Sequence, residues 1–214
     1  HYPNTDWFKE VLRNNSLLQK HNISIRGGND KVKYFIGGGY SNQDAIYKKS
    51  NTYYNQYNIR SNIDAQITKS LKLSVDLAGR IEDQHYSGYD SGTIFYALTR
   101  SFPTSLARYS NGLPAAGMDI GNPVTLVTEE TGYRKYNKSV FNSTFTASLD
   151  LGWLTKGLSI DGYLAFDKEG MEKKEWKTPF YYYVWDEGAN NYEKKKNGSR
   201  DYAELRQDYV PRTS

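Results

Sequence analysis

Long stretches of strictly alternating apolar and polar side chains constrain the fold of this chain more than any other feature. In residues 57–67 most odd positions are apolar and the even positions are polar, and residues 71–82 repeat the pattern. Successive side chains of a strand point to opposite faces of its sheet. Both segments therefore predict strands with one apolar face and one polar face.

Two further pairs of segments follow the same rule. Residues 141–151 alternate before residues 158–166, and residues 22–26 alternate more weakly before residues 34–40, where Phe35 breaks the pattern. Antiparallel partners must oppose apolar side chains, because a slip of one residue would mix the two faces. The intervening turns satisfy this condition if they pair Ile67 with Leu71, Leu151 with Leu158, and Ile25 with Tyr34.

Short turns alternate with long connections along the chain, since residues 41–56 and 83–136 separate the three hairpins. Outer-membrane barrels have tight turns at one end, long extracellular loops at the other, and strands of about 9 to 11 residues. We therefore expect an all-β fold, an antiparallel transmembrane β-barrel segment of about six to eight strands with long extracellular loops.

The expected organisation has seven parts. They are an extracellular loop with a short helix at 1–20, hairpin 1 at 21–40, an extracellular loop at 41–56, hairpin 2 at 57–82, a long extracellular loop at 83–136, hairpin 3 at 137–167, and strand extensions with an extracellular hairpin at 168–214. Thr5 is expected to cap the first helix, and residues 93–100 to form a helical turn. The last hairpin is expected to turn near Glu187 and Gly188.

Composition agrees with a sheet that is apolar on one face only. Hydrophobic residues make up 37% of the chain, with 20 tyrosines among them, and no apolar run is long enough for a spanning helix. The net charge of +4 is dispersed apart from residues 194–196, so no nucleic-acid partner is expected. Cysteine is absent, which excludes disulfides and thiolate sites.

No catalytic or metal-binding constellation is evident, and we expect neither an enzyme nor a cofactor. His1, His21 and His85 lie far apart without a paired ligand. The Asp-Ser-Gly sequence at 90–92 fits no nucleophile motif and is interpreted as a turn. Three glycines at 37–39 lie inside a strand pattern, which predicts a bend or the close approach of another backbone.

Two groups of residues are candidates for function. Polar residues on the even side of the second hairpin are expected to face a barrel lumen: Asn58, Arg60, Asn62, Asp64, Asp76 and Arg80. The alternative is a solvated wall whose charges pair across strands. Aromatic residues in the loops are candidates for contact with a ligand or partner: Tyr86, Tyr89, Phe95, Tyr96, Trp176, Tyr181, Tyr182, Tyr183 and Trp185. The alternative is that these rings pack the loops over the barrel mouth.

A series of short motifs also stands in a familiar order and spacing. They are TDWF at 5–8, HNISIRGG at 21–28, KYF at 33–35, GY at 39–40, YNIR at 57–60, IFYAL at 94–98, PT at 103–104, NPV at 122–124 and GY at 132–133. Together they resemble the barrel of the SusC/RagA family of TonB-dependent outer-membrane transporters. The resemblance covers most of the chain to about Asp167.

The resemblance implies a segment of an outer-membrane importer of oligosaccharides or peptides in a Gram-negative, Bacteroidetes-like bacterium. Its expected partners are outer-membrane lipid, a SusD-like surface lipoprotein, and TonB through an N-terminal part that this chain lacks. The alternative is a secreted β-rich carbohydrate-binding module, whose apolar face would be buried against a second sheet. The two hypotheses differ in whether that face is covered.

Overall fold

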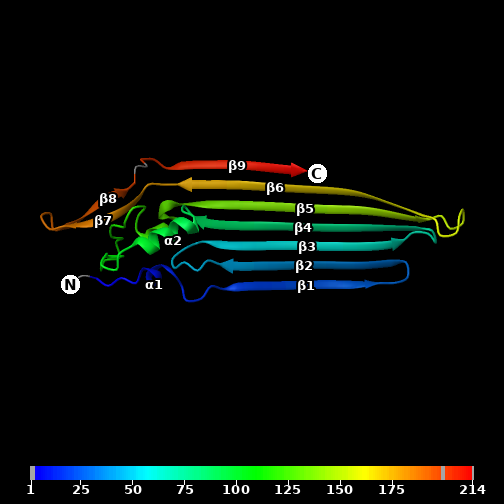
Figure 1. The fold of residues 1–214 in the computed structure, drawn as a ribbon, viewed down its shortest axis with the longest axis horizontal. Coiled ribbons are helices and arrows are strands. Elements are labelled where there is room, and N and C mark those ends of the chain that lie inside the picture. Colours follow the sequence, from blue (N-terminus) through cyan, green and yellow to red (C-terminus); the bar gives the residue numbers. More distant parts are fainter. Residues whose placement is uncertain (1–2, 199–200, 214) are drawn as a thin grey trace.

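Long antiparallel strands lie side by side in one layer, and the helices gather at one end of it (Figure 1). The computed structural model describes residues 3–198 and 201–213, so His1 lies outside the described residues. In spatial order the main sheet contains β1 (Leu18–Gly28), β2 (Val32–Asp44), β3 (Tyr53–Gln66), β4 (Leu71–Ser87), β5 (Gly132–Asp150), β6 (Ser159–Lys177) and β9 (Glu204–Thr213).

The smaller elements lie at the end where the long connections run. They are α1 (Trp7–Val11), α2 (Ser91–Arg100), α3 (Pro123–Leu126), the 3-10 helix η1 (Glu129–Thr131), and a separate hairpin of β7 (Phe180–Asp186) and β8 (Asn191–Asn197). None of the helices in the described ranges is long and apolar enough to cross a membrane.

The expected fold class is confirmed, because seven strands form one antiparallel sheet within the described residues. Short turns join β1 to β2, β3 to β4 and β5 to β6 at one end, and the longer connections lie at the other (Figure 1). Within residues 3–198 and 201–213 the sheet does not close on itself, since β1 has only β2 as a neighbour and β9 has only β6. It is therefore a wall with two free edges.

Two of the three predicted turn registers are confirmed. Tyr57 lies opposite Ile81, and the backbone N–H of Leu151 donates to the carbonyl of Leu158 at 2.9 Å. The first hairpin is different, because Ile25 pairs with Ile36 instead of Tyr34. The side chain of Asn29 accepts from the N–H groups of Lys31 and Val32, which makes the turn wider than two residues. The shift is even, so the faces are unchanged.

One face of the wall carries an exposed apolar band. Ile59, Phe145 and Leu164 are 61%, 50% and 76% exposed, and no part of the described chain packs over them. The band contains Ile23, Ile25, Ile36, Tyr40, Tyr57, Ile59, Ile63, Leu73, Val75, Leu77, Ile81, Phe141, Phe145, Leu149, Ile160, Leu164 and Phe166. We call this side the band face and the opposite side the polar face. Among the described residues the other sheet is the two-stranded β7–β8 hairpin, and its residues do not pack over this band.

The band ends at a row of rings toward the loop end. His21 stacks near Tyr40 at 6.4 Å between centroids, and Tyr40 contacts Tyr57 at 5.0 Å. From Leu71 to Ile81 the band covers about ten residues, which rise roughly 25 Å at the usual strand tilt of a barrel. That height matches the apolar belt of an outer-membrane barrel. The strands continue past this row, and we call those continuing parts the rim.

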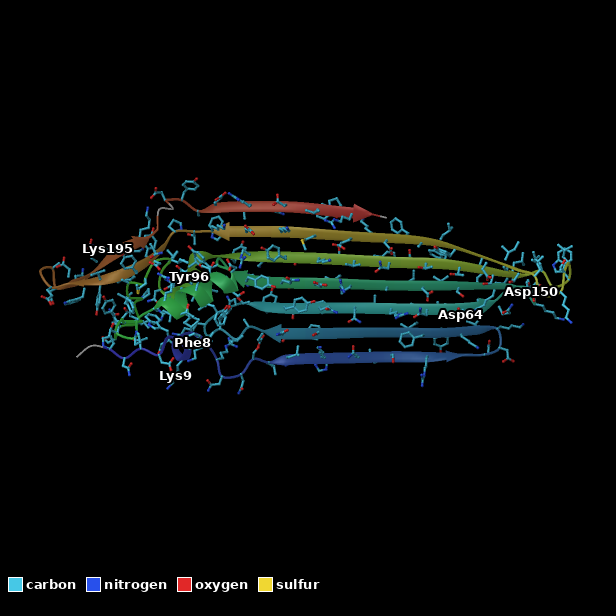
Figure 2. All side chains as sticks on the ribbon, in the orientation of Figure 1. Phe8, Lys9, Asp64, Tyr96, Asp150 and Lys195 are labelled. Carbon is cyan, nitrogen blue, oxygen red and sulfur yellow. The ribbon has the colours of Figure 1, made fainter. Side chains whose placement is uncertain are left out.

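The buried core lies at the loop end, away from the sheet. It joins side chains from α1, α2, α3 and β7: Trp7, Val11, Ile94, Leu98, Val124, Leu126 and Phe180, with Tyr47 from the loop before β3. Figure 2 places Phe8, Tyr96 and Lys195 at this end, and Asp64 and Asp150 at the opposite end. The long connections therefore form a packed cap and are not extended over solvent.

The first helix begins one residue later than expected. Asp6, and not Thr5, is its N-cap, and the Asp6 carboxylate accepts from the backbone N–H of Lys9 at 3.0 Å. The hydroxyl of Thr5 donates instead to the carbonyl of Ser105 at 2.7 Å. Thr5 thus ties the entry of α1 to the long loop, because its side chain is engaged outside the helix.

The glycine run in β2 was expected to mark a bend or the close approach of another backbone. At Gly39 the close neighbours are two side chains instead. A Cβ on Gly39 would lie 2.5 Å from Oδ1 of Asn58 and 2.6 Å from Oδ1 of Asn22. Both asparagines are direct cross-strand neighbours of Gly39 on the polar face. Any larger residue at this position would displace them.

The assignment of faces predicts that a charge destabilises the protein on the band face but not at the adjacent position on the polar face. Ile63→Lys or Val75→Lys should destabilise the intact protein in a bilayer by about 2–4 kcal/mol, because each places a charge in the apolar band. Asn62→Lys, on the polar face, should leave the unfolding free energy nearly unchanged. Urea titration in lipid vesicles measures the three variants, and equal tolerance at positions 62 and 63 would reject the assigned faces.

Candidate functional site

The six residues predicted to face a lumen all lie on the polar face of β3 and β4. Direct register places Asn58 opposite Arg80 and Asn62 opposite Asp76, and Arg60 and Asp64 alternate with them on β3. The structure therefore brings the set together on the side away from the apolar band.

Within this set the charges are paired along and across the strands. The amide of Asn62 donates to Asp76, and the hydroxyl of Ser74 donates to Asp64 at 2.6 Å. Lys72 forms an ion pair with Asp64 at 3.5 Å between Nζ and Oδ2. Because these groups are exposed or only partly buried, each pair contributes little to stability. The result is a hydrated wall, in which Arg60 donates to the neutral amide oxygen of Asn62 at 3.0 Å.

A hollow of about 680 Å³ lies where the polar face meets the cap. Its aromatic lining is Tyr47, Tyr53, Tyr54, Tyr86, Tyr89 and Tyr136, and its polar lining includes Gln43, Asp44, Gln84, Asp90 and Arg134. Tyr54 lies opposite Gln84, which in turn lies opposite Tyr136. The hollow thus lies at the rim end of the polar face, where α2 adds Ile94 and Ser91. It also reaches the strand ends, because Asp44 and Tyr53 have the parity of the band face.

A column of hydrogen bonds on β4 connects the hollow to the predicted lumen residues. The phenol of Tyr86 donates to Gln84 at 3.0 Å, and the amide of Gln84 donates to Glu82 at 3.1 Å. Arg80 completes the column with an ion pair to Glu82 at 2.9 Å. These residues alternate along one strand, so the column follows from the period of two.

Arg134 presents the cationic group of the hollow. Its Nε donates to the carbonyl of Ser87 at 3.2 Å, and its guanidinium lies 5.8 Å from the centre of the Tyr86 ring. Tyr86 also contacts Tyr136, with the ring centres 5.9 Å apart. Stacking of this kind holds a planar cation and two rings in fixed positions.

Two of the phenols that line the hollow have a raised pKa. Burial, followed by the charge of Glu82, raises the pKa of Tyr54, while burial and the hydrogen bond to Glu175 raise the pKa of Tyr136 above the usual value. Both residues lie on the rim, beyond the apolar band. The hydroxyl of Tyr54 donates to Gln56 at 2.8 Å and that of Tyr136 donates to Glu175 at 3.1 Å, so each phenol oxygen can still accept a hydrogen bond from a ligand.

Helix α2 begins at Asp90 on the edge of the hollow. The Asp90 carboxylate accepts from the backbone N–H of Thr93 at 2.9 Å and from its hydroxyl at 2.8 Å. Asp90 is therefore a helix N-cap, whereas its sequence pattern suggested only a turn. These hydrogen bonds lower the pKa of Asp90 below its usual range.

The aromatic candidates do not form one cluster. Tyr89 lines the hollow and packs edge-on against Phe180 with ring centres 5.9 Å apart. Phe95 and Tyr96 are exposed on α2, where Arg100 lies 5.1 Å from the Tyr96 ring. Tyr89 thus belongs to the hollow, while Phe95 and Tyr96 face away from the buried core.

The other aromatic candidates occupy strands. The expectation of a loop position is wrong for Trp176, which lies in β6 opposite Tyr133 on the band face of the rim. Tyr181 and Tyr183 alternate on β7, and the Nζ of Lys194 lies 3.9 Å from the centre of the Tyr181 ring. The backbone N–H of Tyr183 donates to the carbonyl of Pro114, which anchors the hairpin to the cap.

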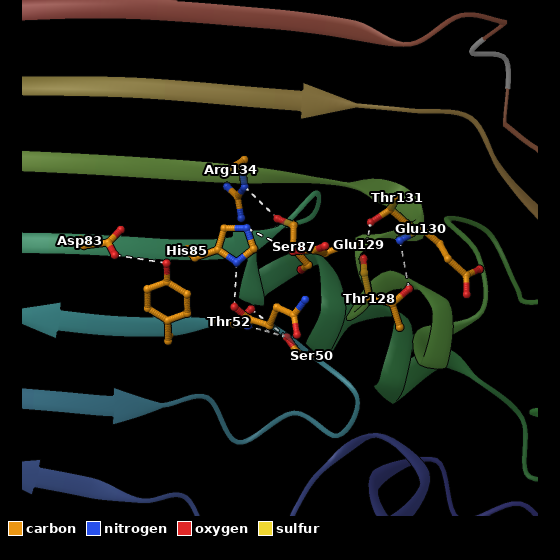
Figure 3. Close-up of polar contacts among 12 residues, drawn as sticks. Ser50, Thr52, Asp83, His85, Ser87, Thr128, Glu129, Glu130, Thr131 and Arg134 are labelled. Carbon is orange, nitrogen blue, oxygen red and sulfur yellow. Dashed lines mark hydrogen bonds and ion pairs between the residues drawn. The ribbon is translucent and has the colours of Figure 1, made fainter.

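His85 fastens two loops to the rim (Figure 3). Its ring is buried, with Nδ1 2.7 Å from the carbonyl of Asn51 and Nε2 3.3 Å from the carboxylate of Glu129. The rings of Tyr53 and Tyr133 lie on either side at 5.5 and 5.7 Å. His85 therefore has a structural role between the loop before β3 and η1.

No group of three or more His, Cys, Asp or Glu side chains able to hold a metal ion is found in residues 3–198 and 201–213. The hollow likewise contains no cysteine and no nucleophile paired with a histidine. Its side chains are suited to reversible contacts through rings and hydrogen bonds.

Several lining residues were missed from the sequence, although a signal was present. Gln84 and Tyr86 continue the even side of β4, and Arg134 and Tyr136 continue the even side of β5. The alternation beyond the band becomes polar on both faces, so a search for apolar periodicity ends too early. Following the parity of residues 72–82 by a further four positions would have found Gln84 and would have placed Tyr86, an aromatic candidate from the sequence, on the same face.

Two curated proteins are similar to the chain in sequence. It is 27% identical over 184 residues to TonB-dependent receptor P3 of Formosa agariphila, a match that covers 81% of this chain and 18% of the receptor. TonB-dependent receptor P26 of the same organism is 27% identical over 164 residues, covering 70% of this chain and 16% of the receptor. No protein-family model matches the chain.

Solved structures of the RagAB peptide importer share the fold. The closed-closed state superposes with a TM-score of 0.63 and the open-open state with 0.64, each at 18% identity, covering 84% of this chain and 20% of the other. This sheet is a barrel-wall segment similar to those of TonB-dependent receptors. The expected resemblance is confirmed, and the wall segment spans about a fifth of the length of the proteins that it matches.

The role of Asp90 as the N-cap of α2 can be tested directly. Asp90→Ala should destabilise the helix by about 1 kcal/mol, while Asp90→Asn should retain most of the cap. Hydrogen exchange of the amides in 91–98 measures the effect in the intact protein. Because the pKa of Asp90 is lowered in the fold, its contribution is present above the ordinary Asp value and is lost as pH falls through the lower folded value. Unchanged exchange in Asp90→Ala would contradict the assignment.

Proposed function

We propose that the chain forms part of the wall and extracellular loops of a TonB-dependent outer-membrane importer. The main support is the exposed apolar band opposite a hydrogen-bonded polar face, in a sheet whose short turns and long loops lie at opposite ends. A closed barrel removes the free edges, which would otherwise leave backbone groups unpaired in hydrocarbon at several kcal/mol each. The apolar band then contacts lipid and the polar face lines the lumen.

The proposed location is the outer membrane of a Gram-negative bacterium of the Bacteroidetes type. The height of the apolar band and its terminal row of His21, Tyr40 and Tyr57 support this location, because such belts end in aromatic girdles. The two similar receptors come from Formosa agariphila. The exposed band argues against the secreted carbohydrate-binding module, which would have to cover it.

The proposed substrate is an oligosaccharide or a peptide that contacts the hollow during passage. Tyrosine rings pack on the apolar faces of sugars or on side chains, while Gln84 and Arg134 are placed to hydrogen-bond hydroxyl or carbonyl groups. Tyr86 and Tyr89 are aromatic candidates from the sequence that line it. The lumen residues Asn58, Arg60, Asn62, Asp64, Asp76 and Arg80 would then line the route below. We propose no bond chemistry for any of them.

The proposed partners are a SusD-like surface lipoprotein at the loop end and TonB, which would contact another part of the protein. The β7–β8 hairpin projects beyond the cap at this end (Figure 1). It carries packed rings, since Trp185 contacts Tyr192 at 4.9 Å and Tyr192 contacts Tyr109 at 4.8 Å. A rigid aromatic surface of this kind suits contact with a partner protein. Tyr181 and Tyr183 belong to the same proposed surface.

Substitutions in the hollow should reduce substrate binding without affecting the wall. Tyr54→Ala and Tyr136→Ala should each weaken binding about 3- to 10-fold, which corresponds to the 0.5–1.5 kcal/mol of one aromatic contact. Tyr209→Ala is the matched control, because Tyr209 lies on the band face of the rim. Calorimetry of the intact protein against defined oligosaccharides and defined oligopeptides measures the affinities. The proposal fails if all three variants bind as the native protein does.

A further inference from the structure

The buried ring of His85 lies between two hydrogen-bond acceptors (Figure 3). Its Nδ1 is 2.7 Å from the carbonyl oxygen of Asn51, and its Nε2 is 3.3 Å from a carboxylate oxygen of Glu129. A carbonyl oxygen and an ionised carboxylate can only accept hydrogen bonds. Both nitrogens must therefore donate, and only the doubly protonated imidazolium carries a proton on each of them.

The neutral ring fits the same surroundings less well. A proton on Nδ1 keeps the hydrogen bond to Asn51 but turns the lone pair of Nε2 toward Glu129. A proton on Nε2 turns the lone pair of Nδ1 toward the Asn51 carbonyl instead. The side chain of His85 is only 5% exposed, so water has little access to separate a lone pair from the acceptor that it faces.

Two tyrosines support a positive charge on this ring. Tyr53 and Tyr133 place their rings on either side of His85, with centres 5.5 and 5.7 Å away and planes tilted by 27° and 37°. The face of a phenol ring attracts a cation, and the attraction is stronger where water is excluded. The protonated ring therefore gains from the rings on its two sides as well as from the acceptors at its edge.

Charged groups from five segments surround the ring. Three are carboxylates and two are cations: Asp44 at the end of β2, Asp83 on β4, Glu129 in η1, Arg13 after α1 and Lys135 on β5. Lys135 is the register partner of His85 and opposes a further positive charge, whereas Glu129 is in direct contact and favours it. The carboxylates exceed the cations by one, so a protonated His85 brings this group to neutrality.

Both contacts of His85 lead directly to the substrate hollow. Thr52 follows Asn51 in the chain and lines the hollow. Arg134 lies five residues beyond Glu129 and supplies the cationic group of the hollow. The two neighbours of His85 on β4 line it as well, because adjacent side chains of a strand point to opposite faces. His85 thus joins two walls of the hollow from the band-face side.

We propose that the doubly protonated form of His85 is a positioning residue for the substrate hollow, and that a rise in pH weakens its contact with η1. The proposal rests on the substrate hollow given under the proposed function. Histidine ordinarily changes its charge between about pH 5 and 8. At the acidic end of this range both contacts are made. As pH rises through the titration of the ring, Nε2 loses its proton and the contact with Glu129 is lost, while Nδ1 still donates to Asn51.

Hydrogen exchange in the intact protein tests the contact without any ligand. Protection of the amides in 129–134, relative to the unfolded chain at the same pH, should be about 3- to 5-fold lower at about pH 8 than at about pH 5.5, as expected for one half-exposed ion pair. Glu129→Gln should show no such difference, because its side-chain amide offers a donor or an acceptor to either form of the ring. His85→Gln, which has no charge at any pH, should show none either.

His21→Gln is the matched control, because His21 is an exposed histidine at the loop end of the apolar band. That variant should keep the pH dependence of the native protein. Heat resistance of the barrel on gels confirms that each variant is folded.

Ligand binding to the same samples tests the positioning role. Calorimetry against defined oligosaccharides and defined oligopeptides should give the native protein an affinity about 3- to 5-fold weaker at about pH 8 than at about pH 5.5, because the start of β5 carries Arg134 into the hollow. Glu129→Gln should bind equally well at both pH values.

The proposal is wrong if the amides in 129–134 of the native protein are equally protected at both pH values, if Glu129→Gln or His85→Gln retains the native pH dependence, or if His21→Gln loses it. A pH-dependent exchange with a pH-independent affinity would also overturn it, because His85 would then have no positioning role. Failure of both ligand classes to bind at either pH would instead reject the substrate hollow, and the exchange result would still decide whether the contact with Glu129 depends on protonation.

Discussion

The backbone register between neighbouring strands is the constraint on which the rest of this structure depends. Side chains alternate with a period of two, so one register decides at once which residues form the apolar band and which form the polar face. The ladder also pairs the backbone groups that lipid would leave without partners. The band and the hydrogen-bonded column on β4 both follow from the same set of strand pairings.

The sequence was informative where the sheet has one apolar and one polar face, because that arrangement imposes alternation. Leu71 to Ile81 has apolar residues at most alternate positions, so the strand, its face and its partner could be predicted from the residues alone. The predicted register of the first hairpin differs from the observed one by two residues. The Asn29 side chain stabilises a wider turn, and the pairing of apolar residues gives no information on turn length. Beyond the band both faces become polar, so the alternation of apolar and polar residues does not show that β6 extends to Lys177.

The candidate site, like the fold, could be predicted only in part. The polar face of β3 and β4 could be predicted, since parity alone assigns it. The hollow could not, because it needs α2 to fold back over the strand ends and bring Ile94 next to Tyr54 and Tyr136. Contacts of this kind join segments far apart in the chain and depend on side-chain packing, which periodicity does not encode.

The position of the buried core at the loop end has a consequence for how the protein forms. Trp7, Ile94, Leu126 and Phe180 come from segments spread over most of the chain, and they meet only when the strands between them are already aligned. Contacts between residues so far apart in the sequence form late, because the entropy of closing the intervening loops is lost before the contacts stabilise the structure. The cap is therefore expected to assemble last, because the aligned strands of the wall must first bring its segments together.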